Sequence, residues 1–175
     1  SDQGTAAPPM TMRFWKMSGA GNDFILLRGL PRGHSGAALA RRLCDRRCGI
    51  GADGMLLMSR HDGRLRLDYW NADGSTAFCG NGSRCAALWA KAMGWTNKTR
   101  FVLDTNRGAL SVRLTGKGRA EVEMPLPHDL RLGLRLKVLG KTHTVHSVDT
   151  GVPHAVLFVP DIKKVAVQPL GRALR

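Results

Sequence analysis

Short apolar runs separated by glycine, proline and asparagine predict many strands and few helices. Residues 14–17 and 24–28 are such runs, and the turn residues between them predict a loop over 18–23. His61-Asp62-Gly63 has the composition of a hairpin turn between the runs 55–58 and 65–70. Further strands are predicted at 100–104, 109–114, 120–124, 135–139, 142–149 and 154–159.

Helical spacing of apolar positions occurs in three segments. Residues 37–47 place alanine and leucine on one side and arginine on the other, and Gly49 is expected to end this helix. The strongest pattern is 81–93, with Gly94 where a left-handed cap residue would stand. A short helix is predicted from about 170 to 175. One mostly apolar helix among many antiparallel-looking strands predicts a sheet curled around that helix.

The composition is that of a globular protein. Of the 175 residues, 43% are hydrophobic and 23% are charged, which excludes an intrinsically disordered chain. No apolar run approaches the roughly 18 residues of a membrane helix, and the first nine residues lack the regions of a secretory signal. We interpret 1–11 as a loose leader and 12–175 as a folded domain. Because 170–175 resembles the start of a helix, we expect a fragment of a longer protein.

The chain is strongly basic. Its 27 Lys and Arg residues against 13 Asp and Glu give a net charge of +14, a balance that often indicates nucleic-acid binding. However, the basic residues are scattered, and aromatic residues make up only 6%, so no base-stacking surface is visible. We expect the charge to be incidental and nucleic acid not to be a partner, and a non-catalytic basic binding module is an alternative.

The cysteines are expected to be free thiols. They fall at 44, 48, 79 and 85, and the spacings C-x3-C and C-x5-C differ from the C-x2-C typical of zinc sites, so no metal is expected. Without a secretory signal, disulfides are not expected either, and a reducing cytoplasm is the predicted location.

The candidate chemistry lies in the segment Cys79-Gly80-Asn81-Gly82-Ser83-Arg84-Cys85. Unpaired N–H groups at a helix start carry positive partial charge, which lowers the pKa of a thiol and also suits a carboxylate or phosphate. Cys79 is therefore predicted to be the most reactive thiol, above an anion pocket. The alternative is a helix start that merely contains structural cysteines. Cys85 is expected to be buried packing.

Five motifs together resemble the diaminopimelate epimerase family, in the family's order, from about residue 12 to the end of the chain. The resemblance implies an α/β (α+β) half in which a curled mixed sheet surrounds a central helix, with the site in the cleft between two such halves. The motifs are Met17-Ser18-Gly19-Ala20-Gly21-Asn22-Asp23-Phe24, Arg47-Cys48-Gly49-Ile50-Gly51-Ala52-Asp53-Gly54, Asn71-Ala72-Asp73-Gly74-Ser75, Cys79 to Cys85, and Thr150-Gly151-Val152-Pro153-His154-Ala155-Val156.

The resemblance implies an isomerase that interconverts LL- and meso-diaminopimelate for lysine and cell-wall biosynthesis. It would use no cofactor, pyridoxal phosphate included, and would work as a homodimer on a small amino-acid substrate. Two cysteines act on opposite faces of the α-carbon, and Cys79 matches the first. The second belongs to a C-terminal half that is mostly absent here, so the domain over 12–175 alone is expected to be inactive.

The same resemblance implies that Asn22, Asn71, Gly80 and Asn81 bind the substrate and that His154 lies near the catalytic pair. Without it, the two loop asparagines are explained as turn residues and the histidine as a packed one. Likewise, Asp53 and Asp73 suit tight turns, and the arginines of 37–47 suit a solvated face.

Two positions depart from the family pattern. Val152 stands where many members have Asn, and Gly54 stands where some members have a substrate-binding Gln. Another pyridoxal-phosphate-independent amino-acid racemase on the same fold therefore remains an alternative.

Overall fold

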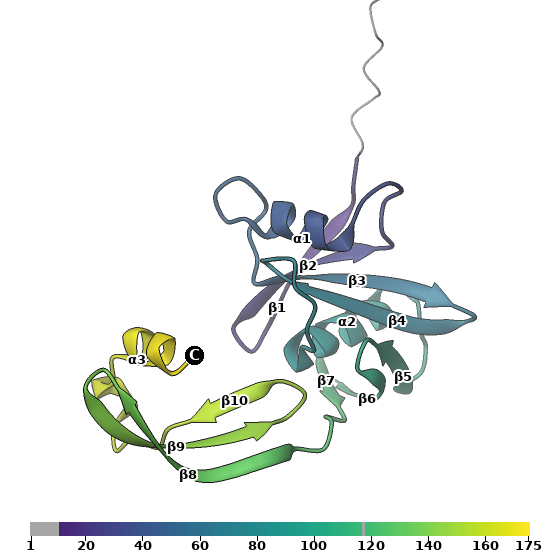
Figure 1. The fold of residues 1–175 in the computed structure, drawn as a ribbon. Helices are drawn as coiled ribbons and strands as arrows, with labels where there is room; N and C mark the ends of the chain where they lie inside the picture. The colour runs from purple at the N-terminus through teal and green to yellow at the C-terminus, as the bar shows by residue number, and fades with distance from the viewer. Residues whose placement is uncertain (1–10, 117) are drawn as a thin grey trace, which may run out of the picture. The chain divides into compact units, whose positions relative to one another are not determined.

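The computed structural model describes residues 11–116 and 118–175 of the chain. They fall into two compact units, drawn in Figure 1, and the boundary along the chain lies between Glu123 and Met124. The predicted leader lies outside the described residues up to position 10, and the domain boundary 12–175 stays a prediction. None of the described helices has the length and apolar character that crossing a membrane requires.

The first unit is a seven-stranded mixed sheet with two helices. The strands follow one another in the sheet in chain order; β2/β3 and β4/β5 are parallel, and the other neighbours are antiparallel. The elements are β1 (Phe14–Gly19), β2 (Asn22–Arg28), α1 (Gly36–Cys44), β3 (Gly54–His61), β4 (Arg64–Asn71), α2 (Gly80–Ala92), β5 (Arg100–Thr105), β6 (Gly108–Gly116) and β7 (Arg119–Val122).

The sheet curls around α2. This helix contacts β1 and β7, the first and last strands, as well as strands between them, and Figure 1 shows it among the strands. Phe24, Leu56 and Trp89 are buried in the core that the helix shares with the inner face. The predicted fold, a curled mixed sheet around a central helix, is confirmed.

The strands β2 and β3 are buried on both faces. Phe24 and Leu26 contribute to the core around α2, whereas Ile25 and Leu27 pack with Leu39 of α1 on the opposite face. Because both faces are covered, these strands are continuous apolar runs without alternation. Burial on both faces therefore explains the continuous apolar runs from which the sequence predicts these two strands.

The predicted loop over 18–23 is wrong in extent. Ser18 and Asp23 are paired across β1 and β2, and the turn itself consists of Ala20 and Gly21, both with positive φ (50° and 91°). A two-residue turn of this kind matches the twist of the flanking strands, so the ladder continues to its edge.

The helix predicted over 37–47 ends earlier, at Cys44. Asp45 Oδ1 accepts hydrogen bonds at 2.7 Å from the backbone N–H groups of both Arg47 and Cys48. An aspartate that binds the following N–H groups offers the backbone an alternative to the helix. The chain therefore turns at Asp45, before Gly49.

The second unit is a small antiparallel sheet in the order β10-β9-β8, with two short helices. Its elements are β8 (His128–Val138), β9 (Lys141–Asp149), β10 (Pro153–Val156), the 3-10 helix η1 (Ile162–Lys164) and α3 (Val167–Leu174). β8 begins seven residues before the predicted strand at 135; Leu130, Leu132 and Leu134 continue the alternation of its second part, a strand signal that the prediction missed. The structure also ends β10 at Val156, before the predicted 159, and starts α3 three residues before 170.

Candidate active site

The thiol of Cys79 is held at the start of α2 by its own sequence. Cys79 is the N-cap residue, with extended backbone, and its Sγ accepts a hydrogen bond from the Gly82 N–H at 3.3 Å. A Cβ on Gly82 would lie 2.8 Å from Leu56 Cδ2, so a side chain beneath the thiol requires Leu56 to shift. The Ser83 hydroxyl and N–H both bind the Cys79 carbonyl, at 2.9 and 2.8 Å. The Cys-Gly-Asn-Gly-Ser order therefore supplies both the hydrogen bonds of the cap and the space beneath the thiol.

The pKa of this thiol is shifted in the direction opposite to the prediction. Burial raises the pKa of Cys79 above its ordinary value, and the N–H groups of Gly82 and Asn81, followed by the charge of Arg84, lower it by less. The expected lowering is therefore wrong for this chain, because loss of hydration outweighs the helix start. At neutral pH, Cys79 is a protonated thiol.

Alkylation of the four cysteines should follow this difference. At pH 7.5 a limiting alkylating agent is expected to label Cys48 first, because Cys48 is exposed whereas Cys44 and Cys85 are buried and Cys79 is half-buried and protonated. Labelling of Cys79 should rise steadily up to and beyond pH 9. Peptide mapping by mass spectrometry at several pH values measures both, and preferential labelling of Cys79 at neutral pH would contradict the raised pKa.

Two of the predicted substrate-binding asparagines are joined directly. Asn81 Nδ2 donates to Asn22 Oδ1 at 2.8 Å, although the residues are 59 positions apart, and Asn81 Oδ1 accepts from Arg84. The contact connects the first residue of β2 with the first turn of α2, where Gly80 is the first helical residue after Cys79. The structure thus brings Asn22, Asn81, Gly80 and Cys79 together.

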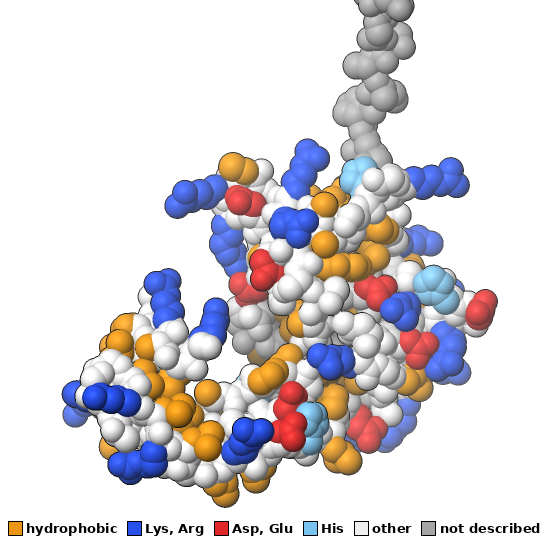
Figure 2. Space-filling model, in the orientation of Figure 1, with side chains coloured by type: hydrophobic (Ala, Val, Ile, Leu, Met, Phe, Trp, Pro, Cys, Tyr) orange, Lys and Arg blue, Asp and Glu red, His pale blue; other side chains and the backbone are white. Residues whose placement is uncertain are grey.

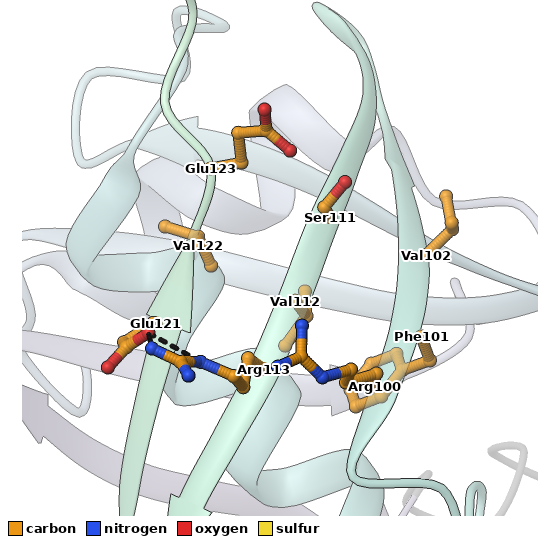
Figure 3. A pocket seen from close by; sticks show the side chains of 9 residues that line it. All are labelled: Arg100, Phe101, Val102, Ser111, Val112, Arg113, Glu121, Val122 and Glu123. Carbon is orange, nitrogen blue, oxygen red and sulfur yellow. Dashed lines mark hydrogen bonds and ion pairs between the residues drawn. The ribbon is translucent and has the colours of Figure 1, made fainter.

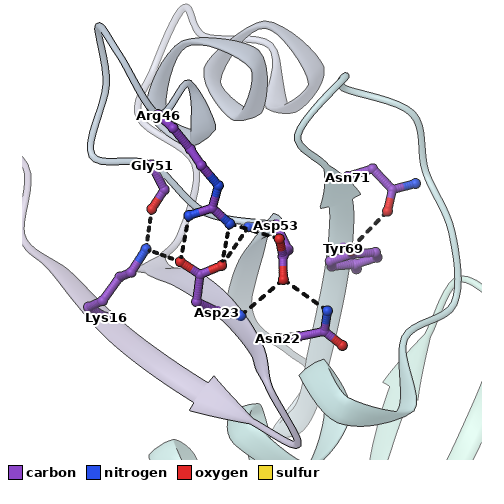
Figure 4. A network of polar contacts seen from close by, with 8 residues as sticks. All are labelled: Lys16, Asn22, Asp23, Arg46, Gly51, Asp53, Tyr69 and Asn71. Atoms are coloured by element: carbon purple, nitrogen blue, oxygen red, sulfur yellow. Dashed lines mark hydrogen bonds and ion pairs between the residues drawn. The ribbon is translucent and has the colours of Figure 1, made fainter. Parts of the chain in front are cut away.

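A charged network supports Asn22 from the other side, as Figure 4 shows. Asn22 Nδ2 donates to Asp53 Oδ2 at 2.9 Å, and Arg46 binds Asp53 and Asp23 at 2.8 and 2.7 Å. The Arg46 guanidinium, with the Lys16 ammonium 2.9 Å from Asp23, holds the pKa of the Asp23 carboxyl well below its usual range.

Sequence reasoning missed this network. Arg46 is exposed, as predicted for the arginines of 37–47, but it also binds two carboxylates, and Asp53 does more than shape a turn. The available signal was that Asp23 and Asp53 lie inside two glycine-rich motifs and that the basic residues Lys16 and Arg46 directly precede them. Until the pairing of the strands is known, the sequence does not show which basic residue binds which carboxylate.

The carboxamide of Asn71 is engaged within its own turn. Its Oδ1 accepts from the Tyr69 hydroxyl at 2.8 Å, and its Nδ2 donates to Ser75 Oγ at 2.9 Å. Among the described residues it makes no hydrogen bond to Asn22, Asn81 or Cys79. The turn explanation thus accounts for its contacts, and its substrate-binding role stays a prediction.

Gly54 lies directly against Tyr69, opposite Asn71 in the β3/β4 ladder. A Cβ at Gly54 would overlap the Tyr69 ring and lie 2.6 Å from its hydroxyl and 2.7 Å from the Trp70 carbonyl. A side chain at this position therefore requires the tyrosine or the strand to move. The glycine that stands at position 54, where some family members have glutamine, therefore fits the packing of Tyr69 in this chain.

We expect Gly54→Ala to lower the free energy of unfolding by about 1–3 kcal/mol, the usual cost of forcing a group into a packed site. Chemical denaturation monitored by circular dichroism measures the change. Gly171→Ala is the matched control, because a Cβ there meets no atom within 4 Å and the residue is in a helix. Equal stability of the two variants would show that Tyr69 moves without cost.

His154 belongs to the second unit. It lies in β10 with an exposed side chain, and its Nε2 is 3.0 Å from Thr150 Oγ1. The half-buried Val152 precedes the same strand. The catalytic role expected of His154 stays a prediction.

A separate pocket lies over β5, β6 and β7, and Figure 3 shows its walls. Arg113 and Glu121 form an ion pair in it, and its lining includes none of the residues predicted for the site.

Within 11–116 and 118–175, no group of three His, Cys, Asp or Glu side chains is arranged to hold a metal ion. On the face drawn in Figure 2, Lys and Arg side chains are scattered and do not form one patch.

The curled mixed sheet around a central helix is a fold that solved structures share. A solved structure of a probable proline racemase from Agrobacterium radiobacter K84 matches 89% of this chain and 54% of its own, with a TM-score of 0.67 at 17% identity. A predicted epimerase from Pseudomonas aeruginosa matches 92% of this chain and 67% of its own, with a TM-score of 0.58 at 16% identity. These likenesses show the fold.

Sequence comparison shows the family. The sequence model of the family described as diaminopimelate epimerase matches residues 14–127. The diaminopimelate epimerases of Caldanaerobacter subterraneus subsp. tengcongensis and Aquifex aeolicus are both 36% identical to this chain over 91% and 94% of its length. The O-ureido-serine racemase of Streptomyces lavendulae is also 36% identical, over 95%. The chain belongs to the diaminopimelate epimerase family, and it spans 63–65% of the length of these three curated relatives.

Proposed function

We propose that this chain forms the first half of the active site of an enzyme that converts LL-diaminopimelate to meso-diaminopimelate. The observation that carries the proposal is the Cys79 thiol at the start of α2, beside the hydrogen-bonded pair Asn22 and Asn81. A proton-transfer group and a set of N–H donors for a carboxylate thus lie at one helix terminus. The expected substrate contacts of Gly80 and Asn71 belong to the same proposal.

The chemistry requires charge stabilisation and two proton-transfer groups. The α-hydrogen of an amino acid is weakly acidic, so a carbanion needs donors directed at its carboxylate, and in this proposal the N–H groups of Gly80 and Asn81 supply them. Cys79 exchanges a proton with one face of the α-carbon. The opposite face needs a second group, which the family resemblance assigns to a second cysteine outside these 175 residues, with His154 nearby.

In this proposal the reaction proceeds without pyridoxal phosphate or another cofactor and feeds lysine and peptidoglycan precursor synthesis. The full-length protein is a homodimer. It works in the cytoplasm, where a reducing environment keeps the Cys79 thiol free.

A second candidate is racemisation of a different amino acid on the same fold. The similarity to O-ureido-serine racemase, equal in identity to that of the two epimerases, favours it. So does Gly54, because Tyr69 occupies the space that a glutamine side chain would need.

The test is an assay of the full-length gene product in deuterated water with LL-diaminopimelate, O-ureido-serine and other amino acids as substrates. Formation of meso-diaminopimelate with α-deuterium supports the first candidate. Inversion of another amino acid only supports the second. Inversion of none would overturn both and favour a binding module.

A further inference from the structure

The two carboxamides at the candidate site belong to a hydrogen-bonded relay with charged ends. Asp53 Oδ2 accepts from Asn22 Nδ2 at 2.9 Å, and Asn22 Oδ1 accepts from Asn81 Nδ2 at 2.8 Å. At the far end, Arg84 donates to Asn81 Oδ1. The relay therefore runs from Asp53 through Asn22 and Asn81 to Arg84.

The chemistry of the ends determines the direction of the relay. An ionised carboxylate only accepts hydrogen bonds, and a guanidinium only donates them. A flip of either carboxamide would place two donors or two acceptors face to face. Each carboxamide also keeps one N–H that has no acceptor among the described residues. The positions of these free N–H groups follow from the direction of the relay.

The Asp53 carboxylate is itself held on its outer side. Its Oδ1 accepts from Arg46 at 2.8 Å, and Arg46 is anchored by two hydrogen bonds to Asp23 at 2.7 and 3.1 Å. The Asp23 N–H donates to the inner oxygen, Oδ2, at 3.2 Å. The outer oxygen thus meets a donor that carries full charge, and the inner oxygen is left to Asn22 and the backbone.

We propose that Asp53 is a positioning residue: it sets the direction of the relay, and so determines where Asn22 and Asn81 present N–H groups to the substrate. This inference rests on the proposed function for the identity of the ligand as an amino acid. Asp53 itself touches no reacting atom and acts through Asn22.

The critical variant is the isosteric Asp53→Asn in the full-length gene product. Arg46 attracts the oxygen of the new carboxamide outward, so its NH2 group turns toward Asn22 and opposes the relay. We expect kcat/KM to fall about 10- to 100-fold, the range that follows from losing one charge-assisted hydrogen bond.

The double variant Arg46→Met/Asp53→Asn separates positioning from stability. Without Arg46, the new carboxamide can turn its oxygen inward to Asn22, and most of the lost kcat/KM should return although the ion pairs of Arg46 are gone. Arg46→Met alone is the control for the cost of losing those ion pairs. A purely structural Asp53 gives the opposite order, with the double variant less active than Asp53→Asn.

A second readout is independent of activity. In 15N spectra of the full-length protein, the side-chain amide signals of Asn22 and Asn81 should both move in Asp53→Asn and return toward their original positions in the double variant. Unchanged signals and unchanged kcat/KM in Asp53→Asn would overturn the relay. If the wild-type protein inverts no amino acid, the proposed function fails, and the amide signals alone decide the relay.

Discussion

Replacement of Cys79 by alanine is expected to lower the rate of α-carbon inversion by the full-length gene product by about 10²- to 10⁴-fold. That range is typical of removing a positioned acid or base. The Cys79 thiol is bound by backbone N–H groups of its own helix turn, and the helix start is also held by Ser83, so the variant should fold with little loss of stability. The measurement is the initial rate in deuterated water, with KM determined alongside.

Cys48→Ala is the matched control, because this thiol is exposed and takes no part in the relay or the helix start. It should retain the wild-type rate. A Cys79→Ala variant with wild-type kcat would show that the proton is transferred by another group and that the helix start only binds the carboxylate.

The 175-residue chain by itself is expected to exchange the α-hydrogen of LL-diaminopimelate slowly without inverting it. Inversion needs an acid and a base on opposite faces of the carbon. Cys85 cannot serve as the second group, because it is about 9 Å further along α2 and buried at 3% exposure. In the proposed function this chain supplies one half of the site, and water on the open side also weakens the electrostatic interactions with the carboxylate.

Incubation in deuterated water, with chiral separation of the products, measures this prediction. We expect α-deuterium in the LL isomer and at most traces of the meso isomer. Cys79→Ala in the same chain should abolish the exchange as well. Meso product at a rate comparable to that of the full-length protein would assign the second role to a described residue such as His154.

Much of the fold was predictable because its signals are local. Continuous apolar runs in β2 and β3 follow from burial on both faces, and the glycine after α2 follows from cap geometry. The motif around Cys79 was also sufficient to place a thiol at a helix start, since the cap is formed by residues within four positions of it.

The details that depend on register were not predictable from local patterns. The two-residue turn at 20–21 lets the pairing of β1 and β2 extend to Gly19 and Asn22, which places Asn22 at the end of the hairpin. Nothing in the stretch 18–23 distinguishes this arrangement from a longer loop. In the same way, α1 stops at Cys44 because one aspartate oxygen binds two N–H groups, a competition that apolar spacing does not record.

The sequence by itself determined the curled sheet, the central helix and the position of the candidate thiol at its start. Tertiary structure alone decided the environment of that thiol and the partners of the polar side chains. The pKa of Cys79 rises because burial outweighs the helix N–H groups, and burial depends on strands distant in sequence. Asn22, Asp53 and Asn81 meet because hydrogen bonds at 2.8–2.9 Å form only after the sheet has curled and set their register.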